Sequence, residues 1–230
     1  MKYPNIVPGI FLKRPNRFIA HVLISGRQET AHVKNTGRCR ELLIPGTRVY
    51  LQEHDNPSRK TRLSLIAVEK GKLLVNIDSQ APNKVMREAL SQGLCLPGLK
   101  GPVTCLKPES VYGGSRFDFF VAAGEQKAYL EIKGVTLELD GVAKFPDAPT
   151  ERGVKHIREL MEAAREGFSA YVVFILQMKG MRYITPNDET HKEFGQALRE
   201  AHKAGVRIIA YDCLVSPDEM TLDKPASVVL

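Results

Sequence analysis

Apolar and polar residues alternate along most of the chain between residues 11 and 79. Five segments have this period of two, and each is bounded by turn-forming residues: 17–25, 30–34, 47–52, 62–70 and 72–78. The alternation predicts five short strands. Five strands in so short a stretch, without a long helix, are typical of a small closed barrel. We expect an oligonucleotide-binding (OB) barrel, although SH3-like barrels give a similar pattern.

The pattern changes after residue 81. A helix is predicted at 82–92, between Pro82 and Gly93, and an amphipathic helix at 150–166, which Gly167 ends. A further helix is predicted at 190–204, and strands at 102–106, 116–123, 127–137, 170–178, 181–184 and 206–212. This order predicts an α+β or α/β fold in which helices flank a mixed sheet. We therefore expect a barrel domain at residues 1–81 and a second domain at residues 82–230.

The positive charge is concentrated in the predicted barrel. Residues 1–80 contain 14 Lys and Arg against 6 Asp and Glu, whereas the remainder is nearly neutral. Clustered cations favour a polyanion partner, because binding to phosphates releases condensed counterions. A soluble basic surface without a partner would have the same composition.

The remaining composition indicates a cytoplasmic protein. No apolar run has the length needed to cross a bilayer, and the first residues lack the apolar core of a signal peptide. The four cysteines are scattered and form no CxxC pair. We expect reduced thiols and no structural zinc site.

Candidate chemistry occurs in the predicted hairpin of strands 116–123 and 127–137. Asp118 lies between Phe117 and Phe119, which we expect on the opposite face, and the second strand carries Glu131 and Lys133. Two carboxylates on adjacent strands suit Mg²⁺ or Mn²⁺, with the carbonyl of Ile132 as a third ligand. A neighbouring lysine can orient the attacking water. The alternative is an ionic ladder across the hairpin, which stabilises a sheet by about 0.2–1 kcal/mol per pair.

Asp118 followed by Glu131-x-Lys133 resembles the PD-(D/E)xK nuclease superfamily, whose core has a similar order of helices and strands. The resemblance implies a further metal ligand on the preceding helix, for which Glu88 is the candidate. It also implies basic or polar residues on the following helix, where Arg152, Lys155 and His156 would bind nucleic acid. The chain departs from the superfamily pattern at residue 117, which is Phe and not proline.

Longer segments resemble the sugar fermentation stimulation protein A family. They are VKNTGRCRELLIPG, GGSRFDFF, YLEIKGVTL and AKFPDAPTERGVKHIREL, in this order. The resemblance implies an OB barrel followed by a nuclease-like domain, nonspecific DNA binding and a role in the regulation of sugar (maltose) metabolism. The alternative is a DNA-binding regulator with a degenerate nuclease fold. A barrel that binds no nucleic acid is a third possibility, and absence of affinity for random DNA at low salt would identify it.

A loop between two barrel strands is the candidate nucleic-acid interface. Residues 35–38 read NTGR, so this loop would present Arg38 and Arg40 to phosphates, with hydrogen bonds from Asn35 and Thr36. The structural alternative is a turn in which Gly37 supplies a positive φ. Other residues could extend the interface, the basic ones as phosphate contacts and the aromatic ones by stacking: Arg14, Arg17, Arg27, Phe11, Phe18 and Tyr50. We expect Phe18 in the core.

The loop before helix 150–166 has two interpretations. Thr150 is a plausible N-cap for this helix. Asp147 could instead assist the metal site, with the N-terminus of the helix facing a phosphate.

Overall fold

The computed structural model describes residues 1–35 and 37–230. The first third of the chain forms a barrel. Its strands are β1 (Ile6–Asn16), β2 (Ile19–Ile24), β3 (Arg27–Val33), β4 (Arg48–Glu53), β5 (Leu63–Lys70) and β6 (Leu73–Asn76). They pair in the order β3-β2-β1-β4-β5-β6, and β3 also pairs with β5, so that five strands close the ring. The predicted five-stranded barrel is confirmed.

Two of the strands that were predicted or found in the barrel differ between the sequence-based prediction and the structure. β1 belongs to the ring but was not predicted, because Pro8, Gly9 and Pro15 interrupt its alternation. β6 was predicted as a barrel strand, but within the described residues it pairs only with β5, at the edge. The remaining predicted segments correspond to β2, β3, β4 and β5.

The rest of the chain forms a mixed sheet with three helices, as predicted. The helices are α1 (Ala81–Ser91), α2 (Glu151–Arg165) and α3 (Asp188–Lys203). The main sheet has the order β15-β14-β12-β9-β8-β7, with β12 parallel to both β9 and β14. Its strands are β7 (Val103–Tyr112), β8 (Ser115–Ala123), β9 (Gln126–Val135), β12 (Ser169–Leu176), β14 (Arg207–Ser216) and β15 (Glu219–Ala226). A small sheet contains β10 (Leu137–Leu139), β11 (Val142–Phe145) and β13 (Tyr183–Pro186).

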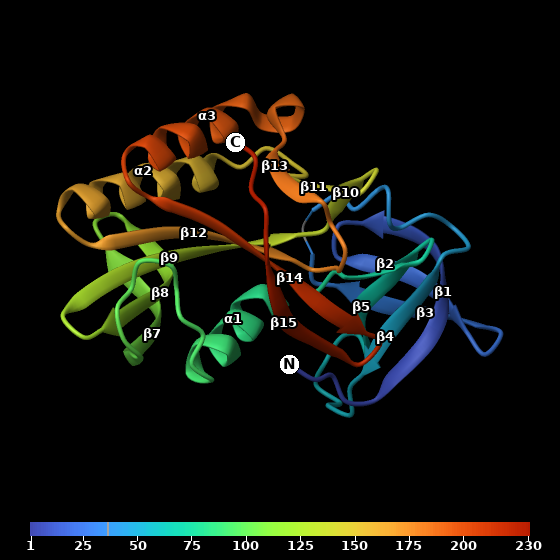
Figure 1. The fold of residues 1–230 in the computed structure, drawn as a ribbon. Coiled ribbons are helices and arrows are strands. Elements are labelled where there is room, and N and C mark those ends of the chain that lie inside the picture. The colour runs from blue at the N-terminus through green and yellow to red at the C-terminus, as the bar shows by residue number, and fades with distance from the viewer. Residues whose placement is uncertain (36) are drawn as a thin grey trace.

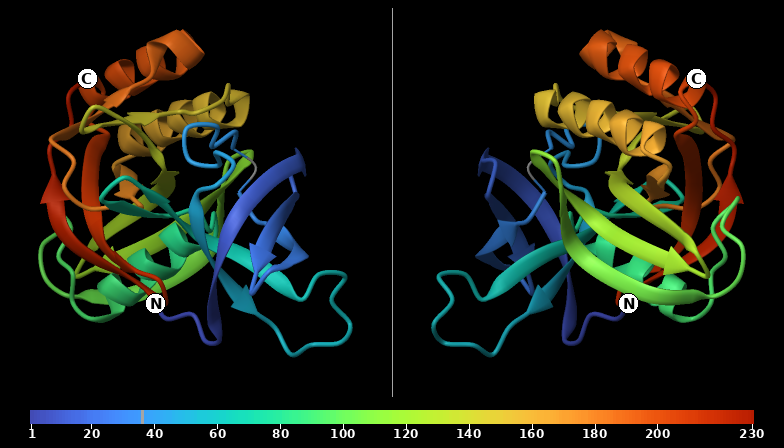
Figure 2. Two further views of the ribbon diagram at one scale, coloured as in Figure 1. Left: turned by 90° about the vertical axis from the view of Figure 1, so that its right-hand side faces the viewer. Right: turned by 90° about the vertical axis from the view of Figure 1, so that its left-hand side faces the viewer.

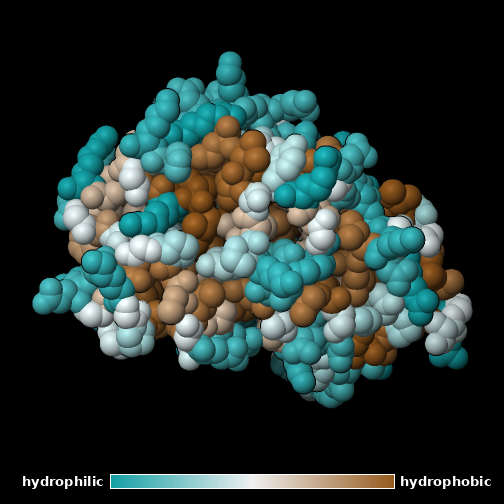
Figure 3. Space-filling model, viewed as in Figure 1, coloured by the Kyte–Doolittle hydropathy of each residue, from teal (hydrophilic) through white to brown (hydrophobic). Residues whose placement is uncertain are grey.

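The helices cover both faces of the main sheet (Figures 1 and 2). α2 and α3 pack on one face through residues such as Ile157 and Phe194, and α1 packs on the other through Val85 and Met86. The outer sides of α2 and α3 are covered by hydrophilic residues (Figure 3), as expected for amphipathic helices. No helix in the described part of the chain is both long and apolar enough to cross a membrane.

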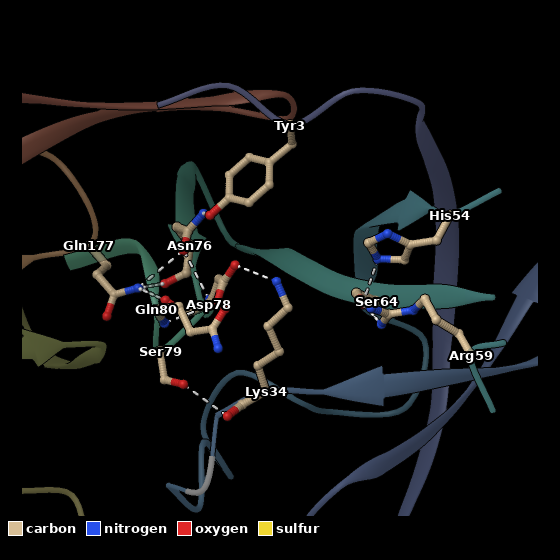
Figure 4. Close-up of polar contacts among 10 residues, drawn as sticks. All are labelled: Tyr3, Lys34, His54, Arg59, Ser64, Asn76, Asp78, Ser79, Gln80 and Gln177. Carbon is tan, nitrogen blue, oxygen red and sulfur yellow. Dashed lines mark hydrogen bonds and ion pairs between the residues drawn. The ribbon is translucent and has the colours of Figure 1, made fainter. Parts of the chain in front are cut away.

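A buried polar network joins the barrel to the second lobe (Figure 4). The Gln177 side chain, just after β12, donates hydrogen bonds to the Asn76 carbonyl at 3.0 Å and to the Asp78 carbonyl at 3.1 Å. Asp78 is fully buried and accepts a hydrogen bond from Lys34 Nζ at 2.8 Å. Because buried polar groups require partners, these contacts favour one arrangement of the two lobes.

Candidate metal centre and nucleic-acid interface

Asp118 lies where β8 separates from β9. The regular pairing of the two strands ends at Phe119 and Leu130. Beyond this point the amide of Ile132 donates a hydrogen bond to Asp118 Oδ2 at 2.7 Å. The expectation that Phe117 and Phe119 share one face is wrong, because Phe117 packs under α2 and Phe119 packs against α1. The side chain of Asp118 therefore fills the gap between the strands.

The start of α1 contacts the second carboxylate oxygen of Asp118. Asn83 Nδ2 donates a hydrogen bond to Asp118 Oδ1 at 2.7 Å. α1 approaches β9 closely because Gly134 has no side chain: a Cβ atom there would lie 2.6 Å from Pro82 and 2.5 Å from Gln177 Oε1. Asn83 was not predicted as a site residue. Its only signal was its position near the beginning of the predicted helix.

Glu131 is buried and receives two charge-assisted hydrogen bonds at one oxygen. Lys133 Nζ donates to Glu131 Oε1 at 2.6 Å, and His156 Nδ1 lies 2.7 Å from the same atom. The other oxygen, Oε2, is buried and has no hydrogen-bond partner among the described residues. Such an unsatisfied buried oxygen is costly unless a ligand supplies the missing interaction.

The two carboxyl groups have pKa values that shift in opposite directions. Burial raises the pKa of Asp118, and the neighbouring charge of Glu131 raises it further. Burial also opposes the charge of Glu131, but the hydrogen bonds from His156 and Lys133, together with the positive charge of Lys133, outweigh burial and hold the Glu131 pKa below its usual value. The two carboxylates thus repel each other in a partly buried site, where a cation would relieve the repulsion.

The donor set fits a hard divalent cation that keeps water ligands. It offers carboxylate oxygens from Asp118 and Glu131, including the unsatisfied Oε2. No cluster of three or more His, Cys, Asp or Glu side chains suited to a metal occurs within residues 1–35 and 37–230. The two carboxylates would therefore need ligands of another kind, such as backbone carbonyls or water.

Glu88 is not part of this site. Its carboxylate forms an ion pair with the terminal amino group of Met1 at 2.7 Å, and its side chain is half exposed. Asn83 and Glu88 are five residues apart on α1, so they point in different directions from the helix axis. The helix was predicted correctly, but Asn83 is the residue that it directs toward Asp118.

α2 places its three predicted residues in different surroundings. His156 is 4% exposed and contacts Glu131, so the expected contact of His156 with a nucleic acid is wrong. Arg152 Nε donates to His156 Nε2 at 3.3 Å, which leaves Nδ1 as the nitrogen that donates to Glu131. Lys155 is exposed and donates to the Gly114 carbonyl at 2.9 Å. Arg152 and Lys155 are both exposed on the surface of α2.

The basic residues of the barrel gather around one guanidinium group. Arg14 donates hydrogen bonds to the carbonyls of Arg17, Asn35, Gly37 and Arg38, at 2.6 to 2.9 Å. Its hydrogen bonds therefore point to the protein itself, and it joins the β1–β2 turn to the 35–38 loop. Beside it is an open hollow of about 350 Å³, lined by Arg14, Asn16, Arg17, Gly37, Arg38, Arg40 and Leu43.

The 35–38 loop is also attached to the second lobe. The amide of Arg38 donates to Asp147 Oδ2 at 3.0 Å, so Asp147 holds this loop and not the metal site. Asn35 Oδ1 accepts a hydrogen bond from the Gly37 amide at 2.7 Å. Thr36 lies outside the described residues. The N-cap prediction at Thr150 is confirmed, since its side chain accepts a hydrogen bond from Gly153 N.

Comparisons with known proteins agree with this two-part arrangement. The family model "SfsA N-terminal OB domain" matches residues 12–77, and "Sugar fermentation stimulation protein RE domain" matches residues 80–219. A sugar fermentation stimulation protein homolog from Clostridium beijerinckii is 54% identical over 230 residues and covers all of both chains. A homolog from Desulfitobacterium hafniense is 57% identical over 220 residues, which is 96% of this chain and 94% of the relative.

A solved structure is also similar over the whole chain. The structure of Pyrococcus furiosus SfsA in complex with Ca²⁺ has a TM-score of 0.89 and 31% sequence identity, and the match covers 100% of this chain and 98% of the other. The sequence and structural matches span both the barrel and the second lobe. The chain therefore belongs to the sugar fermentation stimulation protein A (SfsA) family.

Proposed function

We propose that this protein binds DNA without sequence preference and that its second lobe contains a site for Mg²⁺- or Mn²⁺-dependent phosphodiester hydrolysis. The observation that carries the proposal is the pair of neighbouring carboxylates, Asp118 and Glu131, with the buried and unsatisfied Oε2 of Glu131. The Ca²⁺ bound to the Pyrococcus relative supports a hard divalent cation, because Ca²⁺, Mg²⁺ and Mn²⁺ all prefer oxygen ligands.

The roles of the side chains follow from their contacts. Asp118 and Glu131 would hold the cation, which when bound supplies Lewis-acid stabilisation of a phosphate and lowers the pKa of a water molecule. Asn83 and the Ile132 amide orient Asp118, and His156 orients Glu131. Lys133 would exchange its contact with Glu131 for the attacking water and stabilise the developing negative charge.

The barrel would supply most of the DNA affinity. Arg17, Arg38 and Arg40 are exposed beside the hollow, and such side chains bind phosphates irrespective of sequence. Arg152 and Lys155 would extend the contact toward the carboxylates. We also propose that the chain divides into two domains after residue 81 and that the protein is cytoplasmic. A cytoplasmic location agrees with the four free cysteines.

A DNA-binding regulator without nuclease activity is the second candidate function. The observation that favours it is the tight contact between Lys133 and Glu131, both of which are mostly buried. In this case the ion pair would only stabilise a nuclease-like fold, and the role in sugar (maltose) metabolism would depend on DNA binding alone.

Incubation of supercoiled plasmid with the protein and Mn²⁺ or Mg²⁺ tests the proposal. We expect nicking that a chelator abolishes and that Lys133→Ala reduces by about 10²-fold or more. Arg165→Ala is the matched control, since this exposed residue pairs with Glu162 at the far end of α2. DNA binding without cleavage by the wild type would support the regulator, whereas absence of both would overturn the two candidate functions.

A further inference from the structure

One aromatic side chain lies exposed among the arginines of the barrel. Phe18 is in the turn between β1 and β2 and is 43% exposed, so its expected place in the core is wrong. Phe11 is buried in the barrel, and Tyr50 is half-buried, with its hydroxyl donating to Glu69. All other Phe and Tyr residues in the described part of the chain are buried or half-buried.

The backbone around Phe18 is fixed. Asn16 Oδ1 accepts hydrogen bonds from the amides of Phe18 at 2.9 Å and Ile19 at 3.1 Å. The carbonyl of Phe18 accepts a hydrogen bond from the amide of Val33 at 2.7 Å. An exposed ring on such a constrained turn binds a ligand at a low cost in conformational entropy.

Cationic groups lie next to this ring. The guanidinium carbon of Arg17 lies 4.7 Å from the ring centroid of Phe18. Arg14 ties the carbonyl of Arg17 to that of Asn35, so the ring is held beside the loop that carries Arg38. Asn16 and Arg17 also line the basic hollow. The turn thus combines an aromatic face with a surface for phosphates.

We propose that Phe18 stacks on an unpaired nucleobase, so that the barrel preferentially binds single-stranded DNA. Phosphate contacts alone require no aromatic ring, and in a duplex the face of each base is covered by its neighbours. Base–aromatic stacking with arginines on the backbone is a general means of binding single strands. This inference rests on the proposed function and deepens it by naming the form of DNA that the barrel recognises.

The absence of tryptophan from the chain permits a direct test. Phe18→Trp would contain a single indole, and we expect oligothymidylate to quench its fluorescence. An abasic strand of the same length and a blunt duplex should bind without comparable quenching. Leu214→Trp, at an exposed position on β14 of the second lobe, is the matched control.

Affinity measurements complete the test. Phe18→Ala should weaken oligothymidylate binding about 5- to 150-fold, which corresponds to about 1–3 kcal/mol per stacked base. The affinity for the abasic strand should be unchanged. Phe18→Tyr should restore the wild-type affinity. Circular dichroism would check that the variants are folded.

Each contrary result has a defined meaning. If Phe18→Ala binds both strands like the wild type while Arg38→Ala weakens both, stacking is excluded and phosphate-driven DNA binding survives. Equal quenching of Phe18→Trp by the duplex would contradict the preference for single strands. If the wild type binds none of the three DNAs at low salt, the proposed function fails together with the inference.

Discussion

Glu131 carries its charge in a buried position because His156 and Lys133 donate to it. His156→Ala would remove one donor from a buried carboxylate. We expect the free energy of unfolding to fall by about 2–4 kcal/mol, because an underpaired buried charge is costly. Chemical denaturation at neutral pH measures this change. His202→Ala, at an exposed position on α3, is the control, and equal stability of the two variants would contradict the role of His156.

The residues of the candidate site were recognisable in the sequence, but their contacts were not. Asp118, Glu131 and Lys133 were recognisable because charged residues interrupt apolar strands. His156 was expected to contact DNA, and Glu88 to bind the metal. The contacts of His156 and Glu88 depend on which face of α2 and α1 is turned toward the sheet. Tertiary packing determines that orientation, and the sequence pattern does not show it. Asn83 could not be distinguished from any other polar residue at the start of a helix.

At the scale of elements, the Arg14 guanidinium joins the β1–β2 turn to the 35–38 loop. Arg14→Lys would keep the charge, but one ammonium has three donors and cannot reach four separate carbonyls. We expect a loss of stability of about 1–3 kcal/mol and faster hydrogen exchange in both segments. Lys13→Arg, at the exposed neighbouring position, is the control. Unchanged exchange in Arg14→Lys would show that Arg14 does not hold the loops.

Most helices and strands were predictable because their apolar residues recur with the period of a helix or a strand and face the core in the structure. Besides β1, the strands β10, β11 and β15 were not predicted. β10 and β11 have only three and four residues, too few to establish a period. β15 ends in the polar segment Thr221–Ala226, which includes Asp223, Lys224 and Pro225 and resembles a loop. Such strands form because neighbouring strands supply their hydrogen-bond partners.

At the scale of the whole molecule, an ion pair connects the barrel to the second lobe. Lys70 on β5 donates to the carboxylate and the carbonyl of Glu138 on β10, both at 2.5 Å. Burial opposes the charge of Glu138, but the hydrogen bonds from Lys70 and from the Gly141 amide, together with the positive charge of Lys70, outweigh burial and lower the Glu138 pKa from its usual value of 4.5. A lowered folded-state pKa stabilises the fold above about pH 4.5, and this contribution is lost as pH falls through the folded-state value.

Glu138→Gln should therefore destabilise the protein in a pH-dependent manner. At pH 7 we expect a loss of about 1–2 kcal/mol. The difference from the wild type should decrease as the pH falls below about 4.5, because Glu138 then becomes protonated in the wild type as well. Urea denaturation of both proteins at several pH values measures this difference in the free energy of unfolding. A difference that is constant or grows toward acid pH would contradict this assignment.

The charge distribution of the molecule predicts how DNA binding responds to salt. Affinity for random DNA should fall linearly on a log–log plot of binding constant against salt concentration. Arg38→Ala should lower the magnitude of the slope by about 1, and Arg165→Ala should not change it. Fluorescence anisotropy at a series of salt concentrations provides the slopes. Equal slopes for the wild type and Arg38→Ala would remove Arg38 from the interface.

We propose that Asp118 and Glu131 together bind a divalent cation, and calorimetric titration with Mn²⁺ would measure this binding. We predict that the wild type binds one Mn²⁺ per chain and that Asp118→Asn, which preserves the shape of the side chain, loses this binding while remaining folded. Glu88→Gln should bind like the wild type, because Glu88 contacts the terminal amino group. Absence of Mn²⁺ binding by the wild type, or equal binding by Asp118→Asn, would show that Asp118 and Glu131 do not form a metal site.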